Sequence, residues 1–208
     1  MEHINYIIRQ PFIKGMDIFE SIMNRRSIRK YISKPVEDEK VLKIIDAGHW
    51  APSAGNLQEW QFVIVRDPGR KLQLSEAALG QYWIGQASVI IVVCSKDEKV
   101  TRIYGAEGKN KFIYYDAAMA VQNMLLTADS LGLGACFVGS FDQVAVSRIL
   151  KVPDDMTVHA IITLGYPAEK PNVPHRFGIE TMTYFEEFGR SWTTGIPKSF
   201  RTDYPRNV

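Results

Sequence analysis

The order of apolar and polar positions along the chain predicts alternating helices and strands. A first helix is expected with one apolar face, with Asp17 placed as its cap and four apolar residues at helical spacing: Ile18, Phe19, Ile22 and Met23. A second helix is expected to open at residues 37–39, where acidic side chains suit the helix dipole. The longest helical period covers about residues 112–131 and stops at Gly132 or Gly134.

Four short runs rich in Val and Ile are typical of strands. They are "WQFVIV" (60–65), "SVIIVVCS" (88–95), "ACFVGS" (135–140) and "TVHAIITLGYP" (157–167). Further helices are predicted over residues 71–79 and 142–150, the latter with Asp142 as its cap. Because helices and buried strands interleave, the expected class is α/β or α+β, with a sheet covered on both faces.

The two ends of the chain differ from the middle. We predict an N-terminal extension over residues 1–16, one main domain over residues 17–192 and a C-terminal tail over residues 193–208. The ends lack a clear period but carry many apolar groups, such as Trp192, Phe200 and Tyr204. We therefore expect them to pack against something, and a partner subunit is one such surface.

Composition narrows the functional classes. With 46% hydrophobic residues, 23% charged residues and a net charge of +2, the chain is typical of a globular protein and has no basic domain for nucleic acid. Cys94 and Cys136 lie inside apolar runs and are expected to be buried strand residues. The longest apolar run is too short to span a bilayer, and the N-terminus lacks the features of a signal peptide. The expected location is cytoplasmic, without membrane contact.

A basic run, "NRRSIRKY" (24–31), has two interpretations. Arg25 and Arg26 follow the first helix, so they could simply complement the negative end of its dipole, and on the run alone this is the favoured interpretation. The alternative is an anion clamp, because arginine side chains around Ser27 offer paired donors to phosphate oxygens.

Two further stretches are candidates for chemistry. "APSAGNLQEW" (51–60) is either an ordinary connection or a loop of small residues that lets a flat ligand approach, with Asn56 and Gln58 as donors and acceptors. "LGLGACFVGSF" (131–141) is not a phosphate loop, since its glycines precede a strand. The four histidines have no ligand spacing, so no metal is expected. Asp116 is expected to start a helix or to pair, rather than to act as a base.

In their joint order, four stretches resemble the flavin-dependent nitroreductase family. They are "MNRRSIRKYISKPV" (23–36), "IIDAGHWAPSAGNLQEWQFVIV" (44–65), "DAAMAVQNMLLTADSLGLGACFVGSF" (116–141) and "IITLGYP" (161–167). The resemblance covers roughly residues 17–192. It implies an α+β fold with a central, mostly antiparallel sheet covered by helices, in an intertwined homodimer. It also implies FMN at the dimer interface and hydride transfer from NADH or NADPH to a small acceptor, such as a nitroaromatic or a quinone, by a ping-pong mechanism.

The same resemblance implies the cofactor contacts. Arg25, Arg26, Ser27 and Arg29 would form the first FMN contact. Arg25 and Ser27 would meet the phosphate, and Arg29 would reach the pyrimidine edge of the ring. Gly139 and Ser140 would offer backbone contacts, and Arg176 would close on the phosphate. The other subunit would supply Pro52, Ser53, Ala54 and Asn56, and Gln58 is a further expected cofactor contact. No side chain needs to act as acid or base, because the hydride chemistry belongs to the cofactor.

Some features depart from the family, and some alternatives stay open. Glu59 stands where the family usually has proline, and the first 15 and last 16 residues have no counterpart. The alternatives are a flavin-binding or storage protein with little turnover and a specialised relative, such as a flavin destructase or a dehalogenase. A nucleic-acid module in which Tyr31 stacks on bases is least favoured by the near-neutral charge. Neither the natural acceptor nor the preference between NADH and NADPH follows from the sequence.

Overall fold

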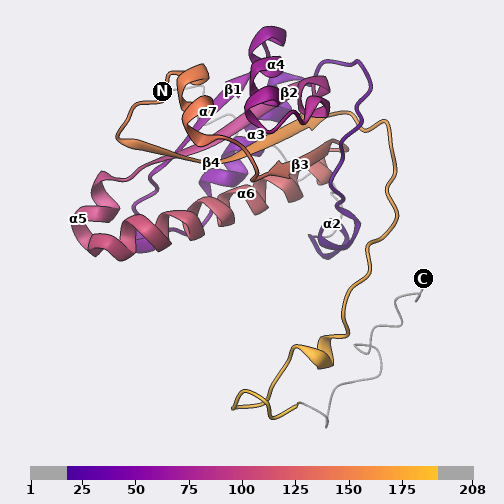
Figure 1. The fold of residues 1–208 in the computed structure, drawn as a ribbon. Helices are drawn as coiled ribbons and strands as arrows, with labels where there is room; N and C mark the ends of the chain where they lie inside the picture. Colours follow the sequence, from indigo (N-terminus) through magenta and orange to yellow (C-terminus); the bar gives the residue numbers. More distant parts are fainter. Residues whose placement is uncertain (1–17, 192–208) are drawn as a thin grey trace, which may run out of the picture. The chain divides into compact units, whose positions relative to one another are not determined.

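The computed structural model describes residues 18–191, and the chain divides into two compact units, Met1–Pro171 and Asn172–Val208. A four-stranded sheet forms the centre of the first unit (Figure 1). Its strands are β1 (Trp60–Val65), β2 (Val89–Lys96), β3 (Gly134–Val138) and β4 (Met156–Gly165), in the order β1-β2-β4-β3. Every pairing is antiparallel, which confirms the α+β prediction and excludes a parallel α/β sheet.

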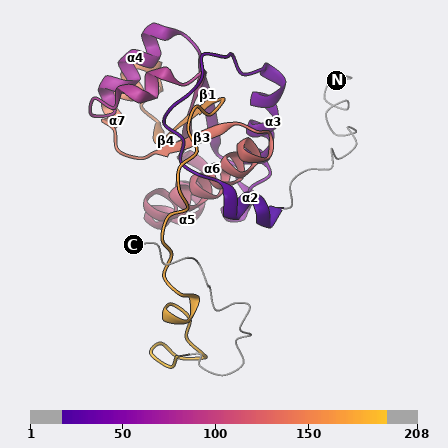
Figure 2. The same cartoon turned by 90° about the vertical axis from the view of Figure 1, so that its right-hand side faces the viewer.

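Helices cover both faces of this sheet, as predicted. Between residues 18 and 171, the α-helices are α2 (Ile18–Asn24), α3 (Asp38–His49), α4 (Pro68–Ala77), α5 (Glu98–Glu107), α6 (Ile113–Ser130) and α7 (Gln143–Leu150). Alternate residues of β2 enter two separate cores, because successive side chains of a strand point to opposite faces. Val89, Ile91 and Val93 pack with α3 and α6. Ile90 and Val92 pack on the other face with α4 and α7 (Figure 2).

Several local predictions are confirmed. Both cysteines are buried strand residues with free thiols, Cys94 in β2 and Cys136 in β3. The Asp142 side chain caps α7 by accepting a hydrogen bond from the Ala145 N–H at 3.0 Å. The long helix α6 ends at Ser130, just before the expected glycines. The strand segments also lie where the pattern placed them.

The first helix carries the apolar face that the pattern predicted. Within one chain this face is exposed, with Ile18 70% and Ile22 49% exposed. The residue of α2 that is buried is Ser21. The apolar stripe is therefore a surface feature of the first unit.

The pattern analysis missed the segment between β2 and α6. This segment forms α5 and then a π-helical turn, η3 (Gly108–Phe112). Gly105 has a φ of 60° and interrupts the helix. The α5 N-terminus is capped from far along the chain, since Glu59 accepts hydrogen bonds from the Lys99 N–H at 3.2 Å and the Val100 N–H at 2.7 Å. A local pattern cannot show a cap whose side chain is 40 residues away.

The described part of the second unit, residues 172–191, holds a short 3-10 turn, η4 (Ile179–Thr181), and a bridge between Tyr184 and Ser191. The predictions for Asp17, for residues 1–16 and for Trp192, Phe200 and Tyr204 lie outside the described residues. The predicted boundaries at residues 16/17 and 192/193 stay predictions.

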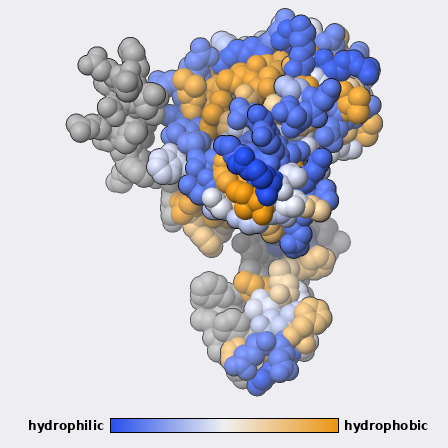
Figure 3. Space-filling view, turned by 90° about the vertical axis from the view of Figure 1, so that its left-hand side faces the viewer, coloured by the Kyte–Doolittle hydropathy of each residue, from blue (hydrophilic) through white to orange (hydrophobic). Residues whose placement is uncertain are grey.

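The surface of the described chain carries apolar groups in separate patches. Figure 3, which faces the side of the molecule where α5 lies, shows hydrophobic areas bounded by hydrophilic residues. Within residues 18–191, no helix combines the length and the apolar character that crossing a bilayer requires.

Candidate functional site

The basic run lies along the outer edge of β3. The Ile28 N–H donates to the Ala135 carbonyl at 3.0 Å, so that Ser27 forms a parallel bridge with Ala135. Further along, Tyr31 bridges Pro167, just past the end of β4. The backbone of residues 27–31 is therefore paired with β3 and with the residues that follow β4. This pairing fixes the direction in which each side chain leaves the backbone.

Three of the predicted phosphate and ring contacts gather around one thiol of β3. Burial raises the pKa of the Cys136 thiol, and Arg29, a side-chain hydrogen bond with Ser27 and the charge of Arg25 all oppose this rise. The charge of Glu169, like burial, raises the pKa of this thiol. Arg25, Ser27 and Arg29 thus all lie near this thiol, and their contacts with FMN stay predictions.

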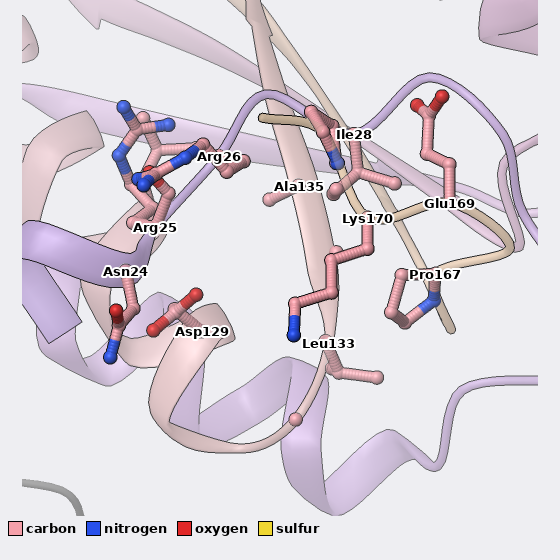
Figure 4. Close-up of a pocket in the computed structure, with 14 residues that line it drawn as sticks. Asn24, Arg25, Arg26, Ile28, Asp129, Leu133, Ala135, Pro167, Glu169 and Lys170 are labelled. Carbon is pink, nitrogen blue, oxygen red and sulfur yellow. The ribbon is translucent and has the colours of Figure 1, made fainter. Parts of the chain in front are cut away.

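A cavity of about 190 Å³ opens beside this segment (Figure 4). Figure 4 shows Arg25 and Arg26 together on one side and the Lys170 ammonium group reaching in from another. The cavity is lined by Asn24, Arg25, Arg26, Ile28, Leu125, Asp129, Gly132, Leu133, Gly134, Ala135, Pro167, Glu169, Lys170 and Pro171. Three cations against two carboxylates leave this wall with a net positive charge, which suits an anion.

Arg26 fits both interpretations of the basic run. Its Nη1 donates to the Met23 carbonyl at 2.6 Å and to the Arg25 carbonyl at 2.8 Å, which satisfies the last turn of α2. Its Nε is buried and has no partner among the described residues, and the same holds for Oδ2 of Asp129. Burial raises the pKa of Asp129, whereas Arg25 and Arg26 oppose that rise. A buried donor and a buried acceptor without partners are both costly.

A short turn brings the basic run to the residues that follow β3. This turn, η2 (Tyr82–Gln86), presents the Trp83 ring to Arg29, with the guanidinium carbon 5.6 Å from the ring centroid. Gln81, directly before it, donates from Nε2 to the Ser140 carbonyl at 3.2 Å. Arg29 and Ser140 therefore both contact residues 81–83, and Gly139 directly precedes Ser140 in the chain. Sequence reasoning missed η2, whose only local signal is an aromatic pair between two predicted elements.

Glu169 is a second residue that the sequence analysis missed. Its Oε1 accepts hydrogen bonds from the Arg29 N–H at 2.6 Å and from the Lys30 N–H at 3.0 Å. The carboxylate thus ties the segment after β4 to the basic run. It satisfies two backbone donors of the basic run.

The loop at residues 51–60 is anchored by side chains. The Ala54 N–H donates to both carboxylate oxygens of Asp116, at 3.0 and 3.1 Å. The Gln58 N–H donates to the Ser53 hydroxyl at 3.1 Å. Asp116 lies in the first turn of α6, so the prediction of a helix-start or pairing residue is confirmed. Burial raises the pKa of this carboxyl, and the hydrogen bond from Ala54 opposes the rise.

The backbone of this loop adopts unusual conformations. Within the 3-10 turn η1 (Ala54–Asn56), Gly55 and Asn56 have φ values of 56° and 55°, and Gln58 follows with 52°. Non-glycine residues rarely adopt positive φ, and such residues are concentrated at functional sites. Gly55 has no room for a side chain, because an added Cβ would lie 2.7 Å from the Tyr104 hydroxyl. Pro52 is exposed beside this turn.

Within one chain, the structure keeps the basic run and the 51–60 loop apart. Arg25 and Arg26 lie by Asp129 in the last turn of α6, whereas Ala54 is bonded to Asp116 in its first turn. These two carboxylates are roughly 20 Å apart along the helix, at about 1.5 Å per residue. The loop also precedes edge strand β1, while the basic run lies on the opposite edge strand, β3. The two predicted parts of the site therefore do not meet in one chain.

Arg176 belongs to the second unit, where its Nη1 donates to the His175 carbonyl at 3.3 Å. Its predicted contact with the phosphate stays a prediction. Among residues 18–191, no cluster of three or more His, Cys, Asp or Glu side chains could hold a metal ion.

Comparison with known proteins places this geometry in a family. The model of the nitroreductase family matches residues 22–82 and 70–166. An NADH dehydrogenase of Thermus thermophilus is 30% identical over 79% of this chain and 94% of its own length. An FMN reductase [NAD(P)H] of Bacillus subtilis is 29% identical, over 82% and 76%. The structure of NADPH:FMN oxidoreductase from Vibrio harveyi complexed with NAD+ is 26% identical and superposes with a TM-score of 0.75, covering 88% of this chain and 80% of that one.

The family match spans well over half of the chain and includes the basic run, the 51–60 loop and all four strands. This chain belongs to the nitroreductase family.

Proposed function

We propose that the protein is an FMN-dependent oxidoreductase, which transfers a hydride from NADH or NADPH to a small acceptor such as a nitroaromatic or a quinone. The family and the names of its relatives, an FMN reductase and an NADPH:FMN oxidoreductase, support this proposal. The observation that carries it is the cationic cavity at the β3 edge, which Arg25, Arg26 and Lys170 line.

The residues of this cavity fit a phosphate group. Arg25, Arg26 and Lys170 offer donors, and the unpaired Nε of Arg26 would gain an acceptor. The two carbonyls that hold Nη1 of Arg26 fix its guanidinium group before a ligand arrives. Such preorganisation lowers the entropy cost of binding. Ser27 and Arg176 complete the proposed phosphate contacts.

Arg29, Gly139 and Ser140 would border the ring. When bound, FMN supplies a ring that accepts a hydride and later gives it up. Arg29 would stabilise the negative charge that the pyrimidine edge carries after reduction, because a fixed guanidinium group pairs best with an anion. No side chain of this chain has to hold or move a proton in the hydride step. The chain's role is to bind, to orient and to tune the charge.

The remaining wall would come from a second copy of the chain. Pro52, Ser53, Ala54, Asn56 and Gln58 lie at the opposite end of α6 from the basic run, and so they can complete the site only across a homodimer. We call this arrangement the composite site: residues 25–29 and 139–140 of one chain with residues 52–58 of the other. Asp116 and Glu59 would hold the second part in place.

Exposed apolar residues next to α6 support the dimer. The outer face of α2 includes Ile18 and Ile22, and the outer face of α6 includes Tyr115, which is 55% exposed, and Met119. Trp50 at the end of α3 is 75% exposed. Apolar patches of this kind mark interfaces in soluble proteins. If FMN lies between the two subunits, the hydride donor and the acceptor could bind in turn at the same face of its ring. Such alternating binding is what a ping-pong mechanism requires.

We further propose a cytoplasmic location, which agrees with the free, buried thiols of Cys94 and Cys136. For the natural acceptor we propose a chemical class, flat and electron-poor molecules.

The absorption spectrum of the purified protein tests the proposal. We expect a yellow protein that releases FMN, not FAD, on denaturation and whose colour bleaches anaerobically with NADH or NADPH. Adding a nitroaromatic or a quinone should restore the colour. A colourless protein that takes up no added FMN would refute the proposal. A protein that binds FMN but is not bleached by either nucleotide would instead be a flavin-binding protein with little turnover.

A further inference from the structure

Arg29 is the one cation of the basic run that the structure holds against an aromatic ring. Its guanidinium carbon lies 5.6 Å from the centroid of the Trp83 ring, within the range of a cation–π contact. Its backbone N–H is bonded to Glu169 at 2.6 Å. The residue is exposed, so without these contacts its long side chain would sample many rotamers. Arg29 is thus restrained at its backbone by one residue and at its guanidinium group by another.

Trp83 is itself well supported. Its ring is half-buried and packs against the core on the α4 and α7 face of the sheet. Ile84, which follows it in η2, is fully buried in the same core. Gln81 joins the start of this turn to the Ser140 carbonyl at 3.2 Å and to the Ala78 carbonyl at 2.9 Å. The ring therefore forms a rigid platform between Arg29 and the residues that follow β3.

We propose that Trp83 is a positioning residue, which orients Arg29 toward the pyrimidine edge of FMN and acts on the cofactor only through it. This inference rests on the proposed function. The guanidinium group is planar, and contact with a ring fixes the orientation of that plane; its donors can then pair with ring oxygen and nitrogen atoms with a smaller further loss of rotamer freedom. Trp83 would thereby raise both the affinity for FMN and the ease of its reduction.

A double-mutant cycle tests this coupling. The four chains are the wild type, Arg29→Ala, Trp83→Leu and the double variant; leucine keeps apolar packing but offers no ring face. FMN dissociation constants come from fluorescence titration of the apoproteins. We expect Trp83→Leu to weaken FMN binding about two- to fivefold in the wild-type background, the size of an exposed cation–π contact. In the Arg29→Ala background the same change should have little effect, because interacting residues are not additive.

Two matched variants and a second readout sharpen the test. Trp83→Phe should recover most of the affinity, since phenylalanine keeps a ring face. Tyr82→Ala changes the exposed neighbour in the same turn and should leave binding unchanged. The midpoint potential of bound FMN should fall in Arg29→Ala and fall less, in the same direction, in Trp83→Leu.

The outcomes separate the two proposals. Equal losses from Trp83→Leu in both backgrounds, or an unchanged potential, would overturn the positioning role while FMN binding by the wild type still stands. A wild-type chain that takes up no FMN would overturn both.

Discussion

Residues 24–31 and the loop at residues 51–60 are both assigned to one cofactor, yet the fold holds them by different means. The first segment is fixed mainly by main-chain pairing, with the Ile28 N–H bonded to the Ala135 carbonyl, and Glu169 adds a carboxylate that accepts from the Arg29 and Lys30 N–H groups. The loop depends on two carboxylates, since Asp116 holds Ala54 and Glu59 joins the loop to α5. Main-chain pairing tolerates a change of side chain, whereas a carboxylate anchor does not. Single substitutions should therefore affect ligand binding in the first region and loop order in the second.

The largest effect is expected from Arg25→Ala. Losing a charged hydrogen bond to phosphate costs about 1.5–3 kcal/mol, so FMN affinity should fall roughly 10- to 150-fold. Because the backbone of residues 27–31 is held by pairing, the urea midpoint should hardly change. Fluorescence titration and urea unfolding measure the two effects. Arg148→Ala, in α7, removes a cation elsewhere and should leave FMN affinity as it is. An equal loss in both variants would contradict a specific contact.

Asp116→Ala should show the opposite profile. It leaves the Ala54 N–H without its acceptor, which should cost about 1–2 kcal/mol of unfolding free energy. Asp116→Asn keeps one acceptor oxygen and should lose less. The exposed Asp46→Ala in α3 is the matched control, with little change in urea unfolding. If Asp46→Ala destabilises the protein as much as Asp116→Ala does, the anchor is not specific.

The free energy of unfolding should also depend on pH, through a histidine that packs against the first turn of α6. Burial lowers the pKa of His159 below its ordinary value of 6.5, and Asp97 opposes the shift. Nε2 of His159 lies 2.6 Å from the Ser95 hydroxyl, which donates to Asp97, and its ring packs edge-on against Tyr114 in the first turn of α6. The folded state thus favours neutral histidine. This stability is present above the unfolded pKa and is lost as the pH falls below 6.5.

The loss can reach at most about 1.4 kcal/mol per pH unit for one proton. Urea unfolding between pH 8 and pH 5 measures it, and His159→Gln should have a flatter profile over that window. Identical profiles for the two proteins would rule out His159 as the titrating group.

The smallest effect is expected from Glu59→Gln. A carboxylate at a helix N-terminus contributes about 0.3–1 kcal/mol, and glutamine keeps the acceptor but not the charge. The variant should be slightly less stable, with faster hydrogen exchange at the amides of Lys99 and Val100. Glu107→Gln, at the other end of α5, should lack this effect. Unchanged exchange at those two amides would show that the cap is not needed.

Sequence patterns predicted most of the elements because their causes are local. The strands follow from runs of β-branched residues, and the α7 start follows from Asp142, whose partner Ala145 is three residues away. The pattern also located the apolar face of α2 but not its exposure, because burial depends on what lies opposite. A periodic apolar face looks the same in the sequence whether another part of the same chain or a second chain packs against it.

The site was less predictable, because its supports are distant in sequence. Trp83 meets Arg29, Glu169 meets Arg29 and Lys30, and Glu59 meets α5. The resemblance to a family suggested the cofactor contacts, but it interpreted Glu59 only as a departure from proline. The structure gives this residue a physical role, which is to cap a helix that the pattern did not show.

The composite site is the central claim, and subunit exchange tests it most directly. Arg25→Ala impairs one part and Asn56→Ala the other, so each homodimer has two damaged sites. After mixing and exchange, every heterodimer should hold one site with both lesions and one with none. FMN titration, at a concentration that fills only intact sites, should then show about half of the sites of each heterodimer restored. Failure to regain any site on exchange, or a monomer with full FMN content and turnover, would contradict the account.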